Sequence, residues 1–229
     1  MGDTPLPDIP PWSEADRLAK EKEVVWFFIS GHPLERFREE VTLLSSRSTA
    51  TLGTWSEHQV TAVVVVTAVK RQISKKTGAE YARLTLEDFH GTADALVFPQ
   101  TWSKLSRVVQ PDAALLLTGG YSLRDRGEDR APFIVEDAVS LEELRANGAV
   151  GLELAWRAGS GPDSESARAV AALCAAHPGS APLFVTWSDG NGSTARLLSR
   201  SVRVDLNEDL IGALREMLGA EHVRLVLAA

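Results

Sequence analysis

Cysteine, long apolar runs and a surplus of positive charge are scarce or missing in this 229-residue sequence. The single cysteine, Cys174, excludes an internal disulfide framework and a cysteine-rich zinc site. No run reaches the ~18 apolar residues that a membrane span requires, and Met1–Pro11 lacks the basic-then-apolar pattern of a signal peptide. The formal net charge of −7 means that a nucleic-acid site must be a local patch. We therefore expect a cytoplasmic protein that does not contact a membrane.

The length fits one or two domains, and the composition shifts divide the chain into three parts. Residues 1–54 hold a proline-rich start, a helical segment and a Ser/Thr linker. The helices expected there begin at Ser13, an N-cap residue, and at Leu34. The pattern then predicts an OB-fold nucleic-acid-binding domain over 55–146 and a small α+β partner-binding domain over 147–229.

Alternating and β-branched runs predict five strands after Trp55. The expected strands are Gln59–Lys70, Tyr81–Leu86, Thr92–Phe98, Ala113–Leu123 and Pro132–Val139. A short helix, Pro99–Val108, separates the third strand from the fourth, and Gly119-Gly120 indicates a bulge or a sharp coil. Five strands with a helix at that place are the element order of an OB-fold β-barrel.

The remainder predicts a β-α-β-β-α-β unit, which follows a short helix, Leu141–Arg145. Its elements are Val150–Arg157, Ser164–His177, Pro182–Trp187, Thr194–Leu198, Asn207–Leu218 and His222–Leu227. Pro178-Gly179 is expected to end the first helix, while Asn207 caps the second and Gly219 closes it. The predicted fold class is mixed α/β with two domains: a five-stranded OB-fold β-barrel, then this small α+β domain, preceded by a helical segment.

Positive charge gathers where an OB-fold contacts oligonucleotides, in the first hairpin and second strand. Between Val69 and Leu86 five cations face one acid, Glu80, a local charge of +4. Flat side chains beside cations suit single-strand binding, because bases stack on them while the cations neutralise phosphates. The nucleic-acid-binding candidates are Lys70, Arg71, Lys75, Lys76, Tyr81, Arg83, Phe98 and Arg124. The competing interpretation is a hairpin rich in lysine for solubility, with aromatic rings that only cover a barrel edge.

The sequence offers no catalytic or metal-binding pattern. Glu87 and Asp88 are adjacent in a strand and should face opposite sides, so they cannot readily share a metal. Nucleotidyl transfer needs convergent carboxylates for two magnesium ions, and the five histidines lack metal-ligand spacing. No phosphate-binding or dinucleotide-binding glycine loop occurs. We expect no catalytic residues, no metal and no cofactor.

Three stretches together carry a family resemblance. They are Trp12-Ser13-Glu14 leading to Ile29-Ser30-Gly31-His32-Pro33-Leu34, the barrel segments Leu84-Thr85-Leu86-Glu87-Asp88, Gly91 and Val97-Phe98, and Ala176-His177-Pro178-Gly179 with Asn207–Leu218. In this order they resemble the C-terminal part of the bacterial DNA polymerase III α subunit. The stretch Trp26-Phe27-Phe28 departs from the family's Gly-Phe-Tyr type of pattern.

The resemblance implies a DNA replication module whose OB-fold holds single-stranded DNA and whose last domain binds a clamp-loader τ-type subunit. The family's polymerase domains lie outside this region, so a separate polymerase catalytic chain is a further implied partner. The chain would be a fragment, a split subunit or a stand-alone relative. Three alternatives stay open: a piece of a DNA-directed DNA polymerase that acts only when joined to its core, a tRNA- or RNA-binding barrel, and a protein-interaction scaffold.

Overall fold

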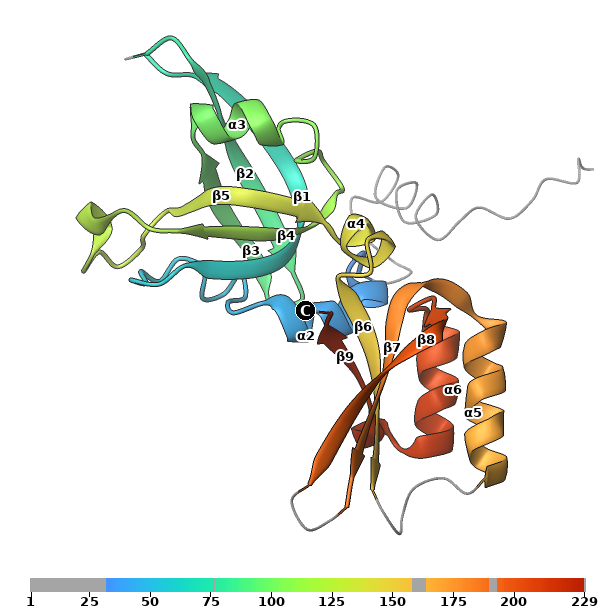
Figure 1. The fold of residues 1–229 in the computed structure, drawn as a ribbon. Helices are drawn as coiled ribbons and strands as arrows, with labels where there is room; N and C mark the ends of the chain where they lie inside the picture. The colour runs from blue at the N-terminus through green and yellow to red at the C-terminus, as the bar shows by residue number, and fades with distance from the viewer. Residues whose placement is uncertain (1–31, 76, 158–163, 190–192, 229) are drawn as a thin grey trace, which may run out of the picture.

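The computed structural model describes residues 32–75, 77–157, 164–189 and 193–228. The described chain forms a closed β-barrel and a second unit, a four-stranded sheet with helices α5 (Ser164–Ala176) and α6 (Glu208–Leu218). Figure 1 shows the two units. The mixed α/β fold class predicted from the sequence is therefore confirmed. The helix predicted from Ser13 and the stretch Trp26-Phe27-Phe28 lie outside the described residues.

The barrel consists of five strands in the closed order β1-β2-β3-β5-β4, which is the OB-fold order. Its elements are β1 (Val60–Ile73), β2 (Glu80–Asp88), β3 (Gly91–Val97), α3 (Pro99–Leu105), β4 (Ala114–Gly120) and β5 (Phe133–Ser140). The first strand pairs with both β2 and β4, which explains why it must be the longest. Helix α3 lies between β3 and β4, as the sequence predicted.

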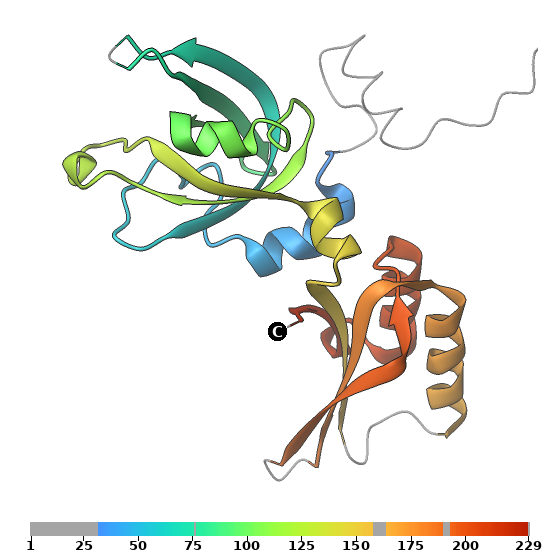
Figure 2. The same ribbon diagram turned by 45° about the horizontal axis from the view of Figure 1, so that its top comes forward.

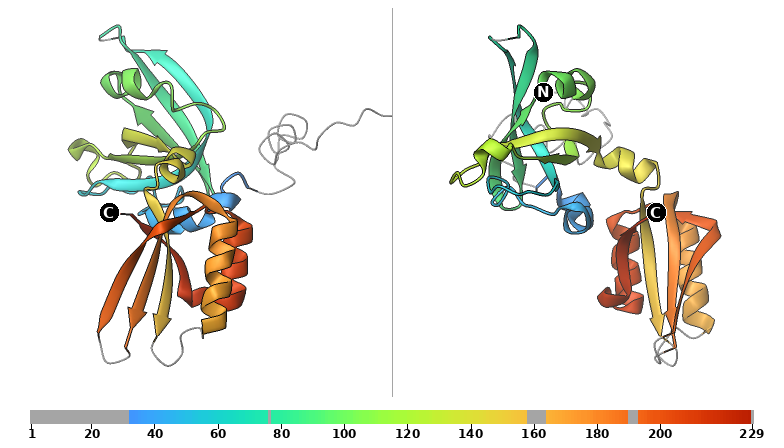
Figure 3. Two further views of the ribbon diagram at one scale, coloured as in Figure 1. Left: turned by 45° about the vertical axis from the view of Figure 1, so that its right-hand side comes forward. Right: turned by 60° about the vertical axis from the view of Figure 1, so that its left-hand side comes forward.

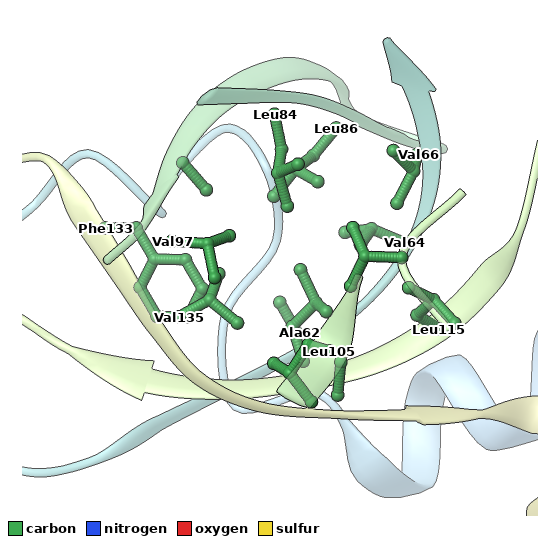
Figure 4. Packing of buried hydrophobic residues seen from close by; sticks show 14 of the residues in the cluster. Ala62, Val64, Val66, Leu84, Leu86, Val97, Leu105, Leu115, Phe133 and Val135 are labelled. Atoms are coloured by element: carbon green, nitrogen blue, oxygen red, sulfur yellow. The ribbon is translucent and has the colours of Figure 1, made fainter. Parts of the chain in front are cut away.

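Alternation along the strands places the apolar side chains inside the barrel. Val64, Val66, Leu84, Leu86 and Val97 are at most 1% exposed, and Figure 4 shows them pointing toward the barrel centre. Burying one such side chain stabilises the fold by about 1.5–3 kcal/mol. The core therefore fixes the register, and the register decides which β2 and β3 side chains face outward.

Gly119 is required where β4 pairs with β5. The pairing register shifts between Thr118 and Gly119, so the predicted bulge is present. A Cβ atom at Gly119 would lie 2.1 Å from the carbonyl oxygen of Ile134. Only a residue without a side chain lets the two backbones approach this closely.

The second sheet has the order β8-β7-β6-β9. Its elements are β6 (Val150–Arg157), α5 (Ser164–Ala176), β7 (Pro178–Ser188), β8 (Thr194–Val204), α6 (Glu208–Leu218) and β9 (Val223–Leu227). Strands β6 and β7 run parallel and α5 connects them, whereas the other pairs are antiparallel. Both helices pack on one face, as Figures 1 and 3 show, and the opposite face carries no helix of this unit. The Asn207 side chain caps α6 by accepting from the Leu210 N–H at 2.9 Å, as predicted.

The Pro178-Gly179 pair begins a strand rather than only ending a helix, which corrects the expected start at Pro182. A proline is tolerated at the first position of a strand. A Cβ atom at Gly179 would lie 2.5 Å from the carbonyl oxygen of Val204, so the glycine permits close contact between β7 and β8. Strand β8 correspondingly extends to Val204, beyond the expected end at Leu198.

Helix α2 (Arg38–Leu44) lies between the barrel and the second sheet, as Figure 2 shows. The segment before it buries Leu34 and Phe37 against barrel residues and against α4 (Leu141–Ala146). The buried Glu40 carboxylate pairs with Arg145 of α4, and Glu39 pairs with Arg215 of α6 at 2.9 Å. Helix α2 therefore contacts both units.

The described part of the Gly-His-Pro-Leu motif, His32 to Leu34, forms a turn at the start of this segment. The His32 Nδ1 atom accepts from the Leu34 N–H at 3.1 Å, and its ring packs on Phe89 with centroids 4.8 Å apart. Burial lowers the pKa of His32 below its ordinary value, although Glu87 and Asp88 act in the opposite direction. The imidazole is therefore neutral at pH 7 and acts as a structural link to the β2–β3 connection.

Candidate nucleic-acid interface

The hairpin formed by β1 and β2 projects beyond the barrel (Figure 1) and presents a row of polar and aromatic side chains. Its register pairs Lys70 with Arg83 and Gln72 with Tyr81, so these four side chains share the outer face. The Tyr81 hydroxyl donates to the Gln72 side-chain oxygen, which holds the ring along the hairpin.

Phe98 follows β3 and joins the same outer face. Arg83 pairs with Leu96, and Phe98 lies two residues beyond Leu96. Phe98 is 49% exposed, which is unusual for a phenylalanine next to a barrel core. The exposed ring is available for contact with a flat ligand.

A groove of about 1010 Å³ runs between the hairpin and the end of β3. Its lining is Gln72, Ile73, Ser74, Lys75, Thr77, Tyr81, Arg83, Leu96, Phe98 and Pro99. This set contains two cations and no acid, so the groove is positive in a protein whose net charge is −7. Neither Lys75 nor Arg83 forms an ion pair with an acid in the described part of the chain. The arrangement suits an anion that carries flat apolar groups.

A smaller hollow of about 180 Å³ continues the groove across the barrel. Arg83 and Leu96 line both hollows, and Arg130 stands on the far side with its Cγ 3.2 Å from the place of a Gly53 Cβ. Asp94 also lines this hollow and weakens its positive charge. In sequence, Arg130 looks neutralised by the acids before it. Arg130 is distinguished from these acids by its place beside Gly53, and only the folded structure shows this place.

Arg71 lies on the other face of the hairpin, away from the groove. It pairs with the buried Ala82, and its guanidinium lies 5.6 Å from the Trp102 ring centroid and 3.9 Å from Glu80. There it lines a separate hollow of about 360 Å³ beside α3. The sequence grouped Arg71 with Arg83, but alternation across the pairing separates them.

The remaining predicted residues are dispersed. Lys70 is exposed next to Arg83 but does not line either hollow of the groove. Arg124 sits in an exposed turn, Leu123–Asp125, and lines neither. Lys76 lies outside the described residues. The structure thus brings together Lys75, Tyr81, Arg83 and Phe98 from the predicted set.

Glu87 and Asp88 face different partners, as strand alternation predicts. The Asp88 carboxylate is buried and accepts from the Thr49 and His90 N–H groups at 2.8 Å and 2.7 Å. Glu87 instead lies 3.8 Å from the His32 ring nitrogen. Across the described ranges, no group of three or more His, Cys, Asp or Glu side chains could hold a metal ion. In the same ranges, no helix is long and apolar enough to cross a membrane.

Comparison with curated proteins gives a consistent result along nearly the whole chain. The DNA polymerase III α subunit of Bacillus subtilis is 28% identical over 210 residues, which cover 92% of this chain and 18% of that protein. The chain resembles the DNA polymerase III α subunit. The subunit of Neisseria meningitidis serogroup A is 28% identical over 225 residues, 96% of this chain and 19% of that protein. The Treponema pallidum subunit is 32% identical over 144 residues, 61% of this chain and 12% of that protein.

The chain therefore spans less than a fifth of the length of these α-subunit relatives. The resemblance to a C-terminal region of the α subunit, indicated by the sequence motifs, is confirmed to this extent. No family model matches the chain.

Solved structures resemble parts of the chain at low identity. Asparaginyl-tRNA synthetase from Pyrococcus horikoshii matches with a TM-score of 0.33 and 14% identity, covering 43% of this chain and 23% of that one. A mitochondrial single-stranded DNA binding protein from S. cerevisiae matches with a TM-score of 0.29 and 12% identity, covering 37% of this chain and 93% of that one. The OB-fold assignment rests on the closed strand order of the barrel.

Proposed function

We propose that the barrel binds single-stranded DNA in the groove between the β1–β2 hairpin and the end of β3. The observation that carries this proposal is the acid-free lining, in which Lys75 and Arg83 stand beside the rings of Tyr81 and Phe98. The phosphates of a single strand can contact the cations while its bases stack on the rings, and this binding does not depend on the base sequence.

Two contributions determine the affinity of such a groove for DNA, phosphate neutralisation and base stacking, and they differ in their dependence on salt. Each phosphate neutralised by a cation releases counterions and adds about 0.7 to the salt slope for a single strand. Each base stacked on an aromatic side chain contributes about 1–3 kcal/mol, with little dependence on salt. Arg83 lies between Tyr81 and Arg130 along the groove. The proposed path of the DNA therefore runs from the hairpin, over Arg83, toward Arg130.

The resemblance to DNA polymerase III α subunits supports a role of this binding in DNA replication. We infer that the barrel tethers the template near a polymerase catalytic chain, and that residues 147–229 dock a clamp-loader τ-type subunit. The boundaries of the two units in this proposal are those predicted from the sequence, 55–146 and 147–229. A role in bacterial replication also implies a cytoplasmic location. The chain contributes tethering and docking in this proposal, while a polymerase core performs nucleotidyl transfer.

Fluorescence anisotropy with labelled oligo-dT tests the groove. Lys75→Glu reverses a charge in the groove, and the matched control Lys104→Glu reverses an exposed charge on α3 that does not line it. We expect Lys75→Glu to weaken binding at low salt and to reduce the salt slope by about 0.7, because one phosphate contact is lost. Lys104→Glu should leave the slope unchanged.

Equal affinities and slopes for the wild type and Lys75→Glu would remove the groove proposal. Competition with tRNA in the same assay addresses the RNA alternative: stronger displacement by tRNA than by unlabelled oligo-dT would favour RNA. A primer-extension assay with the chain alone should give no product, because the proposed activity is binding.

A further inference from the structure

Strand β8 forms an edge of the second sheet. It pairs only with β7 among the described strands, so the outer side of its backbone has no strand partner there. The opposite edge differs, because β9 lies against α2. An unprotected edge strand is a template on which another extended segment can add.

The accessible part of this edge is short and apolar. Residues 194–198 pair regularly with β7, and an irregularity follows between Leu198 and Arg203. Leu197 and Leu198 are 60% and 55% exposed and point to opposite faces. Natural proteins often place charges or prolines on an edge to prevent association, and β8 does carry arginines, including Arg196 beside Leu197. The two adjacent exposed leucines still leave an apolar patch on this edge that a partner can cover.

The charge of β8 is of one sign. Thr194–Val204 contains three arginines and no acid, in a protein with a net charge of −7. Arg196 is held by Glu153 at 3.1 Å and Arg203 donates to the Ser180 carbonyl oxygen at 2.8 Å. Arg200 is exposed and has no ion-pair partner in the described ranges. This free charge next to the leucines favours an acidic partner.

Two other occupants fit less well. A nucleic acid needs several flat rings for stacking, but residues 194–198 themselves expose leucines. Of the rings on β7 beside them, only Trp187 is exposed, at 39%, and the Phe184 ring is covered by the Arg196 guanidinium at 3.9 Å. A second copy of this chain would set β8 against β8 and bring arginines of both copies together, which is destabilising.

We propose that β8 docks an extended segment of a partner protein in which acidic residues alternate with apolar ones. The segment adds as a fifth strand beside residues 194–198. Its backbone hydrogen-bonds to the free edge, its apolar side chains cover the two leucines, and its carboxylates meet Arg200. The inference rests on the docking role proposed for residues 147–229 and specifies the chemistry of that partner.

The experiment uses the full chain and two displayed libraries of peptides about ten residues long, the upper range of strand length. One library alternates Asp or Glu with apolar residues, and the other alternates Lys with apolar residues. The test variants are Leu197→Glu and Arg200→Glu. The matched controls are Leu227→Glu, an exposed leucine on β9 at the opposite edge, and Arg168→Glu on α5. Circular dichroism and oligo-dT binding verify that each variant is folded.

We expect the wild type and both controls to enrich the acidic library, and a selected peptide to bind the two test variants at least about tenfold more weakly. On peptide binding, backbone amides in 194–198 should gain protection from hydrogen exchange. Enrichment of the basic library, no enrichment, or equal binding to wild type and Leu197→Glu would overturn the proposal. Concentration-dependent dimerisation abolished by Leu197→Glu would instead assign the edge to a second copy.

A parallel measurement with a clamp-loader τ-type subunit separates the two proposals. If that subunit binds the chain and Leu197→Glu does not weaken it, the β8 inference fails and the docking function stands. If acidic peptides bind β8 and the subunit does not bind, the clamp-loader assignment fails.

Discussion

Replacing Glu153 by glutamine tests the buried charge cluster at the centre of the second sheet. The Glu153 side chain is 4% exposed and accepts from the Thr186 hydroxyl at 2.7 Å and from Arg224 Nε at 2.6 Å. Arg196 Nε lies 3.1 Å away on the other side. The Glu153→Gln side chain retains the size and the Thr186 contact but loses the charge that both arginines face.

The expected loss of stability follows from the two arginine contacts. A hydrogen bond to a charged partner contributes about 1.5–3 kcal/mol, against about 1 kcal/mol for a neutral one, so two contacts lose roughly 1–4 kcal/mol. The arginine side chains are 44% and 63% exposed. Solvent screening therefore reduces the expected loss in the free energy of unfolding to roughly 1–2 kcal/mol at pH 7.

The same cluster predicts how this loss depends on pH. Burial raises the pKa of the Glu153 carboxyl, but the hydrogen bonds from Thr186 and Arg224 and the nearby arginine charges outweigh it, and the net pKa lies below its ordinary value. Its stabilising effect is therefore complete above the pKa of the unfolded chain, about 4.3. This stabilisation is lost as the pH falls through the lower pKa of the folded state, because the wild-type carboxyl then becomes neutral, like the side chain of the Glu153→Gln variant.

Urea denaturation at a series of pH values measures both effects. We expect the difference between the wild type and Glu153→Gln to be largest near pH 7 and to shrink as the pH falls below about 4. Glu216→Gln, which changes an exposed carboxyl on α6, is the matched control and should behave as the wild type. A difference that is absent at pH 7, or equally large in acid, would refute this account of the cluster.

Two further predictions concern the barrel. Phe98→Ala should weaken oligo-dT binding by about 5- to 150-fold, the equivalent of one stacked base, while Leu123→Ala, an exposed residue outside the groove, should not; equal anisotropy titrations would contradict the stacking role. Gly119→Ala should lower the free energy of unfolding by about 1–3 kcal/mol, because its Cβ meets the Ile134 carbonyl oxygen, whereas a Cβ at Gly120 meets nothing within 4 Å. Urea melts that show equal losses for Gly119→Ala and Gly120→Ala would show that close packing at Gly119 is not the cause.

The barrel could be predicted well from the sequence because its signals are local. The alternation of Ala82, Leu84 and Leu86 fixes the buried face of β2, and each of the three is at most 1% exposed. Gly119 indicated the bulge because a glycine inside a strand often marks a bulge, a bend or a close backbone approach. The predicted start of β7 at Pro182 was wrong for the opposite reason. Whether Pro178 and Gly179 belong to the strand depends on how closely β8 approaches β7, which is not a local property.

The candidate site was only partly predictable, because counting charges along the chain does not show on which face of a strand each side chain lies. Arg71 and Arg83 belong to the same cationic segment, and only the pairing register of β1 with β2 shows that they face opposite sides. Arg130 was missed because the acids next to it in sequence are not its neighbours in the groove. The β8 edge gave no sequence signal, since strand order within a sheet is a long-range property.

The position of α2 affects how this protein can be divided for experiments. The Ser/Thr stretch after Leu44 looks like a natural place to begin a truncated barrel. Such a truncation would remove Leu34 and Phe37, which are 0% and 1% exposed, and would expose the apolar surface of Val63 and Val65. It would also leave Arg145 and Arg215 without their carboxylates. Isolated pieces for biophysical work should therefore start before Leu34, and aggregation of shorter ones would report a missing packing partner rather than an unstable barrel.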